Sequence, residues 1–95
     1  MILEVAVLNV IPDTEDDFLK AFSKAKDIIS NSPGYSSHQL KRCIENKSQF
    51  ILLVEWENLT DHTEGFRLSK EYQQWKALLH HFYNPFPTVE HYENI

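Results

Sequence analysis

The side chains best suited to chemistry in this sequence are concentrated between Trp56 and Trp75. His62 lies in this stretch, and an imidazole can accept or donate a proton near neutral pH. Tyr72 and Trp75 are three residues apart, so they share one face of a helix and could stack a planar substrate. Trp56 and Phe66 would complete an aromatic box. The same aromatics could instead form plain core, with His62 as a helix-end residue in a local hydrogen bond, and the sequence leaves both interpretations open.

Asn9 is a second candidate because it is an amide within an apolar strand. Residues 2–11 carry apolar side chains on both alternating sets, which is typical of a strand covered on both faces. Glu4 alone interrupts one of these sets with a charge. A buried amide without a partner costs roughly 1–3 kcal/mol. Asn9 is therefore expected to hydrogen-bond either to the fold itself or to a ligand carbonyl.

The strands and helices that position these residues can be predicted from the periodic repeat of apolar side chains and from the residues that interrupt it. The first strand, Ile2–Ile11, ends at Pro12, which cannot donate to a sheet. Asp13 and Thr14 can then cap a helix that ends near Ser30–Asn31. Two further strands, joined by a turn, are expected to form a hairpin over Tyr35–Glu45 and Gln49–Glu57.

The second half of the chain adds one more helix and one more strand. A short capped helical piece is expected over Asn58–Gly65, and Ser69 then caps a longer helix. The predicted buried face of that helix holds Tyr72, Trp75, Leu78, Leu79 and Phe82. After a rigid loop over 84–87, the last strand is expected over Thr88–Tyr92. The order β-α-β-β-α-β in one domain over residues 1–95 predicts an α+β, ferredoxin-like sandwich with an antiparallel four-stranded sheet.

Composition argues against several classes of partner. The formal net charge is −5 and no stripe of Lys and Arg is present, so nucleic acid is not an expected partner. No segment approaches the ~18 consecutive apolar residues of a membrane span, so no membrane is expected either. Cys43 is the only cysteine and cannot form an intrachain disulfide, which favours a cytoplasmic location. The histidines and carboxylates show no spacing typical of metal ligands, so no metal site is expected.

The apolar strands raise the question of what covers them. Two helices can cover only one face of a four-stranded sheet, yet the strands 2–11 and 49–57 are apolar on both faces. An uncovered apolar face marks an interaction surface, and the simplest partner is a second copy related by a two-fold axis. The sequence therefore predicts a homodimer formed through the sheet face.

The chain resembles the antibiotic biosynthesis monooxygenase (ABM) domain family in its β-α-β-β-α-β order, in Pro33-Gly34 before the second strand, and in the run Trp56, His62, Phe66, Ser69, Tyr72 and Trp75. This resemblance covers nearly the whole chain. It implies a dimeric α/β barrel whose active cavity lies between the sheet and its helices. Some members oxidise aromatic polyketides with O₂ and without metal or flavin, so no cofactor is expected. Others open the haem ring, and others are quinol oxidases or isomerases.

Haem degradation is disfavoured by the helix. Asn9 resembles the strand-one Asn of the haem-degrading members, but their haem-ligating His falls one residue beyond the position of Trp75, where this chain has Lys76. A protonated lysine cannot donate a lone pair to iron, whereas a neutral imidazole can. The upstream aromatic of those members, usually Trp, corresponds to Phe66 here.

Two functional hypotheses follow. The first is a cofactor-independent monooxygenase that deprotonates a small planar phenol or quinol and holds the anion for reaction with O₂. Its expected catalytic residues are Asn9 and His62, and its expected substrate-binding residues are Trp56, Phe66, Tyr72 and Trp75. The alternative is a non-catalytic dimeric small-molecule-binding or sensing module on the same fold, since a fold does not determine a function. An open cleft lined by Asn9, Trp56 and His62 would favour the first hypothesis, and solid packing of Tyr72 and Trp75 onto the sheet would favour the second.

Overall fold

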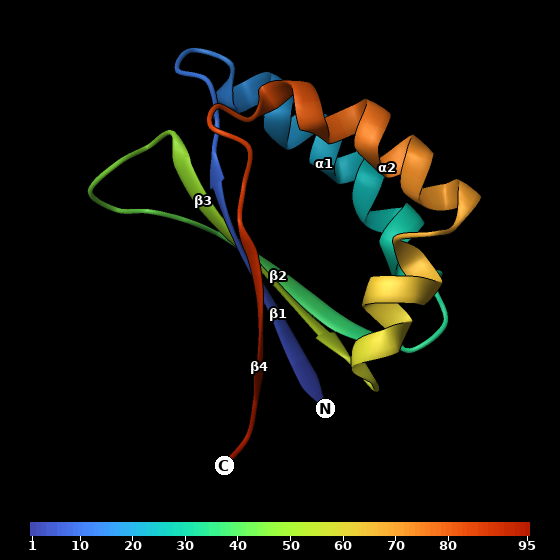
Figure 1. The fold of residues 1–95 in the computed structure, drawn as a ribbon. Helices are drawn as coiled ribbons and strands as arrows, with labels where there is room; N and C mark the ends of the chain where they lie inside the picture. Colours follow the sequence, from blue (N-terminus) through green and yellow to red (C-terminus); the bar gives the residue numbers. More distant parts are fainter.

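A four-stranded antiparallel sheet with the strand order β2-β3-β1-β4 forms one layer of the protein, and the helices form the other (Figure 1). The computed structural model describes residues 1–95. The predicted ferredoxin-like α+β fold is confirmed. Its elements are β1 (Ile2–Asn9), α1 (Glu15–Ser30), β2 (Tyr35–Arg42), β3 (Gln49–Trp56), the π-helix η1 (Asp61–Phe66), α2 (Lys70–Leu79), the 3₁₀ turn η2 (His80–Phe82) and β4 (Val89–Glu93).

Several elements end earlier than their sequence pattern predicts. β1 stops at Asn9 because the backbone of Val10 and Ile11 turns to the segment after α2: Val10 bridges to Tyr83, and the Ile11 N–H donates to the Phe82 carbonyl over 2.9 Å. β2 stops at Arg42 and β3 at Trp56. α2 ends at Leu79, so Phe82 is buried from the following turn and not from the helix itself.

The core lies between the helices and the sheet face that they cover. α1 contributes the predicted stripe Phe18, Phe22, Ala25 and Ile29, all buried. The sheet contributes alternate residues of its two central strands, β1 and β3, including Ala6, Leu8, Phe50, Leu52, Val54 and Trp56. None of the helices combines the length and the apolar composition needed to cross a bilayer.

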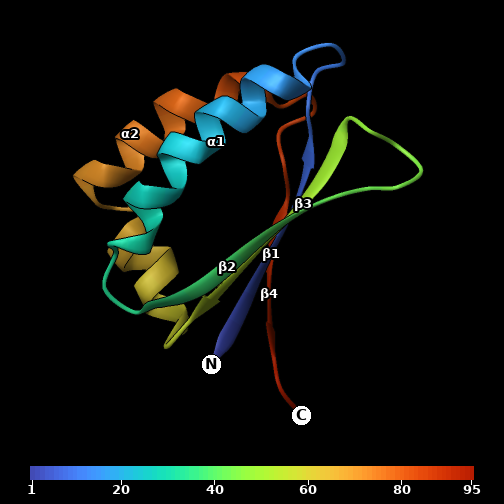
Figure 2. The ribbon, with the colours of Figure 1, turned by 180° about the vertical axis from the view of Figure 1, so that it is seen from behind.

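The opposite face of the sheet has no helix over it (Figure 2). Val5 and Val7 of β1 lie opposite Leu53 and Ile51 of β3 there, and Tyr92 of β4 lies opposite Leu3. These side chains alternate with the buried residues of the same strands and are half-buried or exposed. The two central strands are thus apolar on both faces, as predicted.

Of the three predicted helix caps, only the one at Ser69 forms, since neither α1 nor η1 has a side-chain hydrogen bond at its N-cap. The Ser69 Oγ accepts a hydrogen bond from the Tyr72 N–H over 3.2 Å and caps α2. At α1 the Thr14 hydroxyl donates back to the Ile11 carbonyl over 2.6 Å and accepts nothing from the helix. The acidic first turn of α1 (Glu15, Asp16 and Asp17) still complements the positive end of the helix dipole.

Ser69→Ala is expected to lower the free energy of unfolding by about 1 kcal/mol, because the N–H groups in the first turn of α2 lose their acceptor. Urea unfolding followed by circular dichroism measures the change. Thr14→Ala is the matched control, since its hydroxyl caps no helix N–H, and it should cost less. A loss for Thr14→Ala equal to that for Ser69→Ala would contradict the assignment of the cap.

Candidate active site

A cavity of about 360 Å³ lies between the helix-covered face of the sheet and the helices η1 and α2. Ala6, Leu8 and Leu52 of the central strands line it from the sheet side. Phe66, Tyr72 and Trp75 line it from the helical side, with the ring of Phe66 5.5 Å from Tyr72 and 5.7 Å from Trp75 in edge-on packing. The aromatic helix face is therefore both core and cavity wall.

The structure brings four of the six predicted site residues to this cavity and leaves two outside it. His62, Phe66, Tyr72 and Trp75 line the cavity. Asn9 alternates with the buried Leu8 and Val10, so its side chain faces the open side of the sheet, while its carbonyl accepts from the Asn84 N–H over 2.8 Å. Trp56 is fully buried behind the cavity, and its ring stacks on His62 at 5.3 Å.

Glu4 is the acidic residue of the cavity lining, and the site prediction does not include it. It is only 5% exposed and lies on the helix-covered face of β1, where it lines the cavity. The Trp56 Nε1–H donates to its Oε1 over 3.0 Å. Burial raises the pKa of the Glu4 carboxyl, although the hydrogen bond from Trp56 and the charge of Arg67 oppose the shift. The signal for Glu4 was the single charge in an otherwise apolar alternating set.

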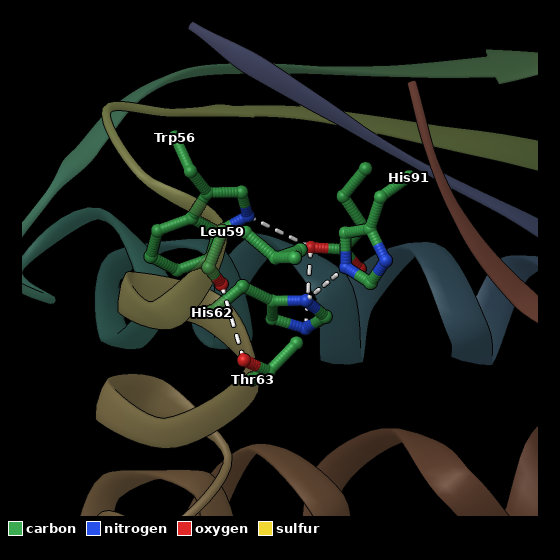
Figure 3. Close-up of polar contacts among 6 residues, drawn as sticks. Trp56, Leu59, His62, Thr63 and His91 are labelled. Atoms are coloured by element: carbon green, nitrogen blue, oxygen red, sulfur yellow. Dashed lines mark hydrogen bonds and ion pairs between the residues drawn. The ribbon is translucent and has the colours of Figure 1, made fainter. Parts of the chain in front are cut away.

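His62 is 4% exposed and connects Glu4 to His91 in the middle of β4. Its Nε2 lies 3.4 Å from the Glu4 Oε1, and its Nδ1 hydrogen-bonds with the His91 Nε2 over 2.8 Å (Figure 3). Burial, followed by the positive charge of Arg67 and the neighbouring His91, lowers the His62 pKa from 6.5 to about 3. The imidazole is therefore neutral at pH 7, and its contact with Glu4 is not an ion pair.

The π-helical turn η1 holds His62 in place. Within η1 the chain widens to π-helical geometry, and the Arg67 N–H donates to the His62 carbonyl five residues back over 3.0 Å. Such turns are frequent at functional sites. Gly34 permits the close approach of this turn, because a Cβ there would lie 2.2 Å from the Asp61 Cγ, and its φ of +85° also favours glycine. The Pro33-Gly34 break thus seats η1 against the start of β2.

The His62→Gln variant is expected to be less sensitive to acid than the wild type. Between about pH 6.5 and pH 3 the unfolded chain binds a proton on His62 that the folded chain does not, so stability falls by roughly 1.4 kcal/mol per pH unit as the pH drops. Above pH 6.5 the two states bind equally and this contribution is flat. Urea midpoints from about pH 7 to pH 5 measure the slope, which should be shallower in the variant.

The comparison with the wild type is needed because Glu4 has the opposite effect on how stability changes with pH. Its raised pKa makes the folded chain bind a proton first as the pH falls, which stabilises the fold. His81→Gln makes the same chemical change at an exposed position and serves as the control. Equal slopes for the wild type and His62→Gln would contradict a buried, neutral His62.

The other end of the cavity is lined by Tyr72, His80, Tyr83 and Phe86. Burial, with a smaller contribution from Lys76, lowers the pKa of His80, so that its imidazole is neutral at pH 7. Burial also raises the pKa of the Tyr83 hydroxyl, which stays protonated. Both side chains are therefore uncharged hydrogen-bonding groups in an aromatic setting.

Known proteins resemble this chain in sequence and in fold. The profile described as "Antibiotic biosynthesis monooxygenase" matches residues 1–78. The uncharacterized protein YczJ of Bacillus subtilis is 54% identical over 95 residues, which cover 100% of both chains. A Bordetella bronchiseptica protein whose crystal structure is named after the same family superposes with a TM-score of 0.94 at 30% identity, over 99% of this chain and 96% of that one. SnoaB, a cofactor-independent oxygenase from Streptomyces nogalater, shares the fold with a TM-score of 0.78 at 14% identity, over 99% and 92%.

Proposed function

This chain belongs to the antibiotic biosynthesis monooxygenase family, and from that premise we propose that it is a cofactor-independent monooxygenase. Its substrate is a small planar phenol or quinol that binds in the cavity between the sheet and the helices. Phe66, Tyr72 and Trp75 bind the aromatic ring of the substrate, because aromatic rings pack favourably against one another in offset-stacked and edge-to-face arrangements. Asn9 and Trp56 have no contact with this substrate, because neither lines the cavity.

The observation that carries the proposal is a buried carboxylate in the wall of an aromatic cavity. Glu4 retains one oxygen, Oε2, that accepts no hydrogen bond from the protein. A carboxylate whose pKa is raised by burial is a stronger base than one in water. A substrate hydroxyl next to it can therefore transfer its proton to Glu4.

The chemistry balances with O₂ as the only co-reactant. Once the phenolic proton has passed to Glu4, a hydrogen-bearing ring carbon ortho or para to the phenolate oxygen forms a bond to O₂. Loss of the hydrogen on that carbon and cleavage of the O–O bond then release water and leave a quinone. One oxygen atom enters the quinone and the other enters water. Exclusion of solvent by the aromatic walls strengthens each polar contact with the developing charge.

His62 and Trp56 act on this reaction through Glu4. Trp56 is a positioning residue, since its indole N–H fixes the Glu4 carboxylate. With a pKa of about 3, His62 is too weak a base to take the substrate proton, and both of its ring nitrogens already face protein partners, so its role is to orient Glu4. Its hydrogen bond to His91, a half-buried residue, links the site to the surface. Lys76 is exposed and lies outside the cavity lining.

Oxygen consumption by the purified protein tests the proposal. A panel of naphthols, hydroquinones and hydroxyquinones should include compounds that are converted to quinones with one O₂ consumed per quinone formed. Saturable binding of such compounds without oxygen uptake would favour the non-catalytic binding or sensing module instead. Neither binding nor uptake across the panel would reject both functions for this cavity.

We also propose that a second copy of the chain covers the open face of the sheet. The support is the pair of apolar rows on β1 and β3 that no part of this chain covers. Contiguous apolar surface of this kind marks an interaction site, and a two-fold axis lets the same face serve both partners.

A further inference from the structure

The cavity is elongated along β1. Three successive helix-facing residues of that strand line it, namely Glu4, Ala6 and Leu8. Glu4 and Leu8 are four residue steps apart along the strand, which is about 13 Å at the usual rise per residue. Tyr83 bridges to Val10, just beyond Leu8, so the group of Tyr83 and His80 closes the end opposite Glu4. The cavity thus has a polar group at each end and apolar walls between.

His80 is the unexplained polar group at this far end. Its ring packs edge-on against Phe86 at 4.8 Å and against Tyr72 at 5.9 Å. Neither ring nitrogen hydrogen-bonds within the protein, and Nδ1 is buried without a partner. Buried polar atoms in native proteins are nearly always paired, so the buried and unpaired Nδ1 bears on which ring nitrogen carries the proton.

The environment also assigns the tautomer of His80. A neutral imidazole carries one N–H, and a buried N–H without an acceptor is rarer than an unused acceptor. Nδ1 has neither a partner nor access to water, so the proton belongs on Nε2. His80 lines the cavity, and Nε2–H is then the hydrogen-bond donor that it can offer to a ligand.

We propose that His80 donates a hydrogen bond from Nε2 to a ligand oxygen, and that the cavity therefore selects planar fused-ring aromatics with oxygen substituents at both ends of their long axis. One oxygen lies at Glu4 and the other at His80. The inference rests on the proposed function only in taking this cavity as the substrate site. It adds a second recognition point and a minimum ligand length.

Anaerobic calorimetric titration with a matched pair of ligands tests this. The probes are 2,6-dihydroxynaphthalene, with a hydroxyl at each end, and 2-naphthol, with only one. The wild type should bind the diol roughly three- to tenfold more tightly, as expected for one additional neutral hydrogen bond. His80→Phe should reduce this ratio to about one for lack of a donor. His80→Gln should keep part of it through its amide N–H.

His81→Phe is the matched control, because the neighbouring His81 is exposed and does not line the cavity; it should keep the wild-type ratio. The proposal is overturned if the wild type binds the two probes equally, if it binds neither, or if His80→Phe keeps the ratio. Since O₂ is excluded, the ratio is independent of turnover. A failure of the monooxygenase proposal would appear only in the oxygen-uptake assay.

Discussion

Replacing Glu4 by glutamine is expected to lower the kcat for oxygen consumption by about 100-fold or more, the usual loss when a general base is removed. Glutamine keeps the size of the side chain, and its carbonyl oxygen can still accept from the Trp56 N–H. It cannot accept the substrate proton. KM should change little, because the aromatic walls remain intact. Oxygen-electrode assays on the best phenol or quinol of the panel give both constants.

Two comparisons make the result specific. Glu71→Gln makes the same change on the exposed surface of α2 and should leave kcat unchanged. Glu4→Asp retains a carboxylate and should keep more activity than Glu4→Gln. The wild-type kcat/KM should fall with acid through an apparent pKa above the ordinary 4.5 of a carboxyl, since burial raises the pKa of Glu4. If the Glu4→Gln variant kept full activity, Glu4 would not be the general base and another residue would have to accept the proton.

Placing a charge on the open face of the sheet is expected to abolish dimer formation. Leu53 lies opposite Val5 near the middle of that face. Leu53→Glu would bury an unpaired carboxylate in the contact between two copies, which costs several kcal/mol and shifts the association constant by orders of magnitude. Sedimentation velocity should show a dimer for the wild type at micromolar concentration and a monomer for the variant. Circular dichroism should show an unchanged fold, because the residue is not part of the core.

Leu68→Glu provides the control for this experiment. Leu68 is 78% exposed in the segment between η1 and α2, away from the sheet, so the same chemical change should leave the dimer intact. A wild-type protein that stays monomeric at micromolar concentration would refute the proposed dimer. So would a Leu53→Glu variant that sediments like the wild type, because the open face would then not be the contact.

The local patterns of this chain were sufficient for its fold. The alternating apolar residues of β1, the helical stripe from Phe18 to Ile29 and the Pro33-Gly34 break predict elements that the structure contains. The Ser69 cap also forms as predicted. These features depend on interactions within a few residues, so sequence reports them directly. The ends of β1 at Asn9 and of β2 at Arg42 depend on distant backbone partners, so they differ from the predicted ends by a few residues.

The composition of the site required the tertiary structure. Alternation along β1 places Glu4 and Leu8 on one face and Asn9 on the other, but it does not say which face the helices cover. That choice follows from the path of the chain between strands. It turns Asn9 away from the cavity and makes Glu4 part of its wall.

The sequence by itself determined the aromatic helix face, the buried strand pattern and the odd charge at position 4. Only the folded chain decided that Trp56 and His62 would meet that charge, from 52 and 58 residues away, and that His91 would join them. Contacts over such separations are set by strand pairing and by the crossing of layers. No local periodicity encodes them, and they are what turns an apolar cavity into a candidate site for chemistry.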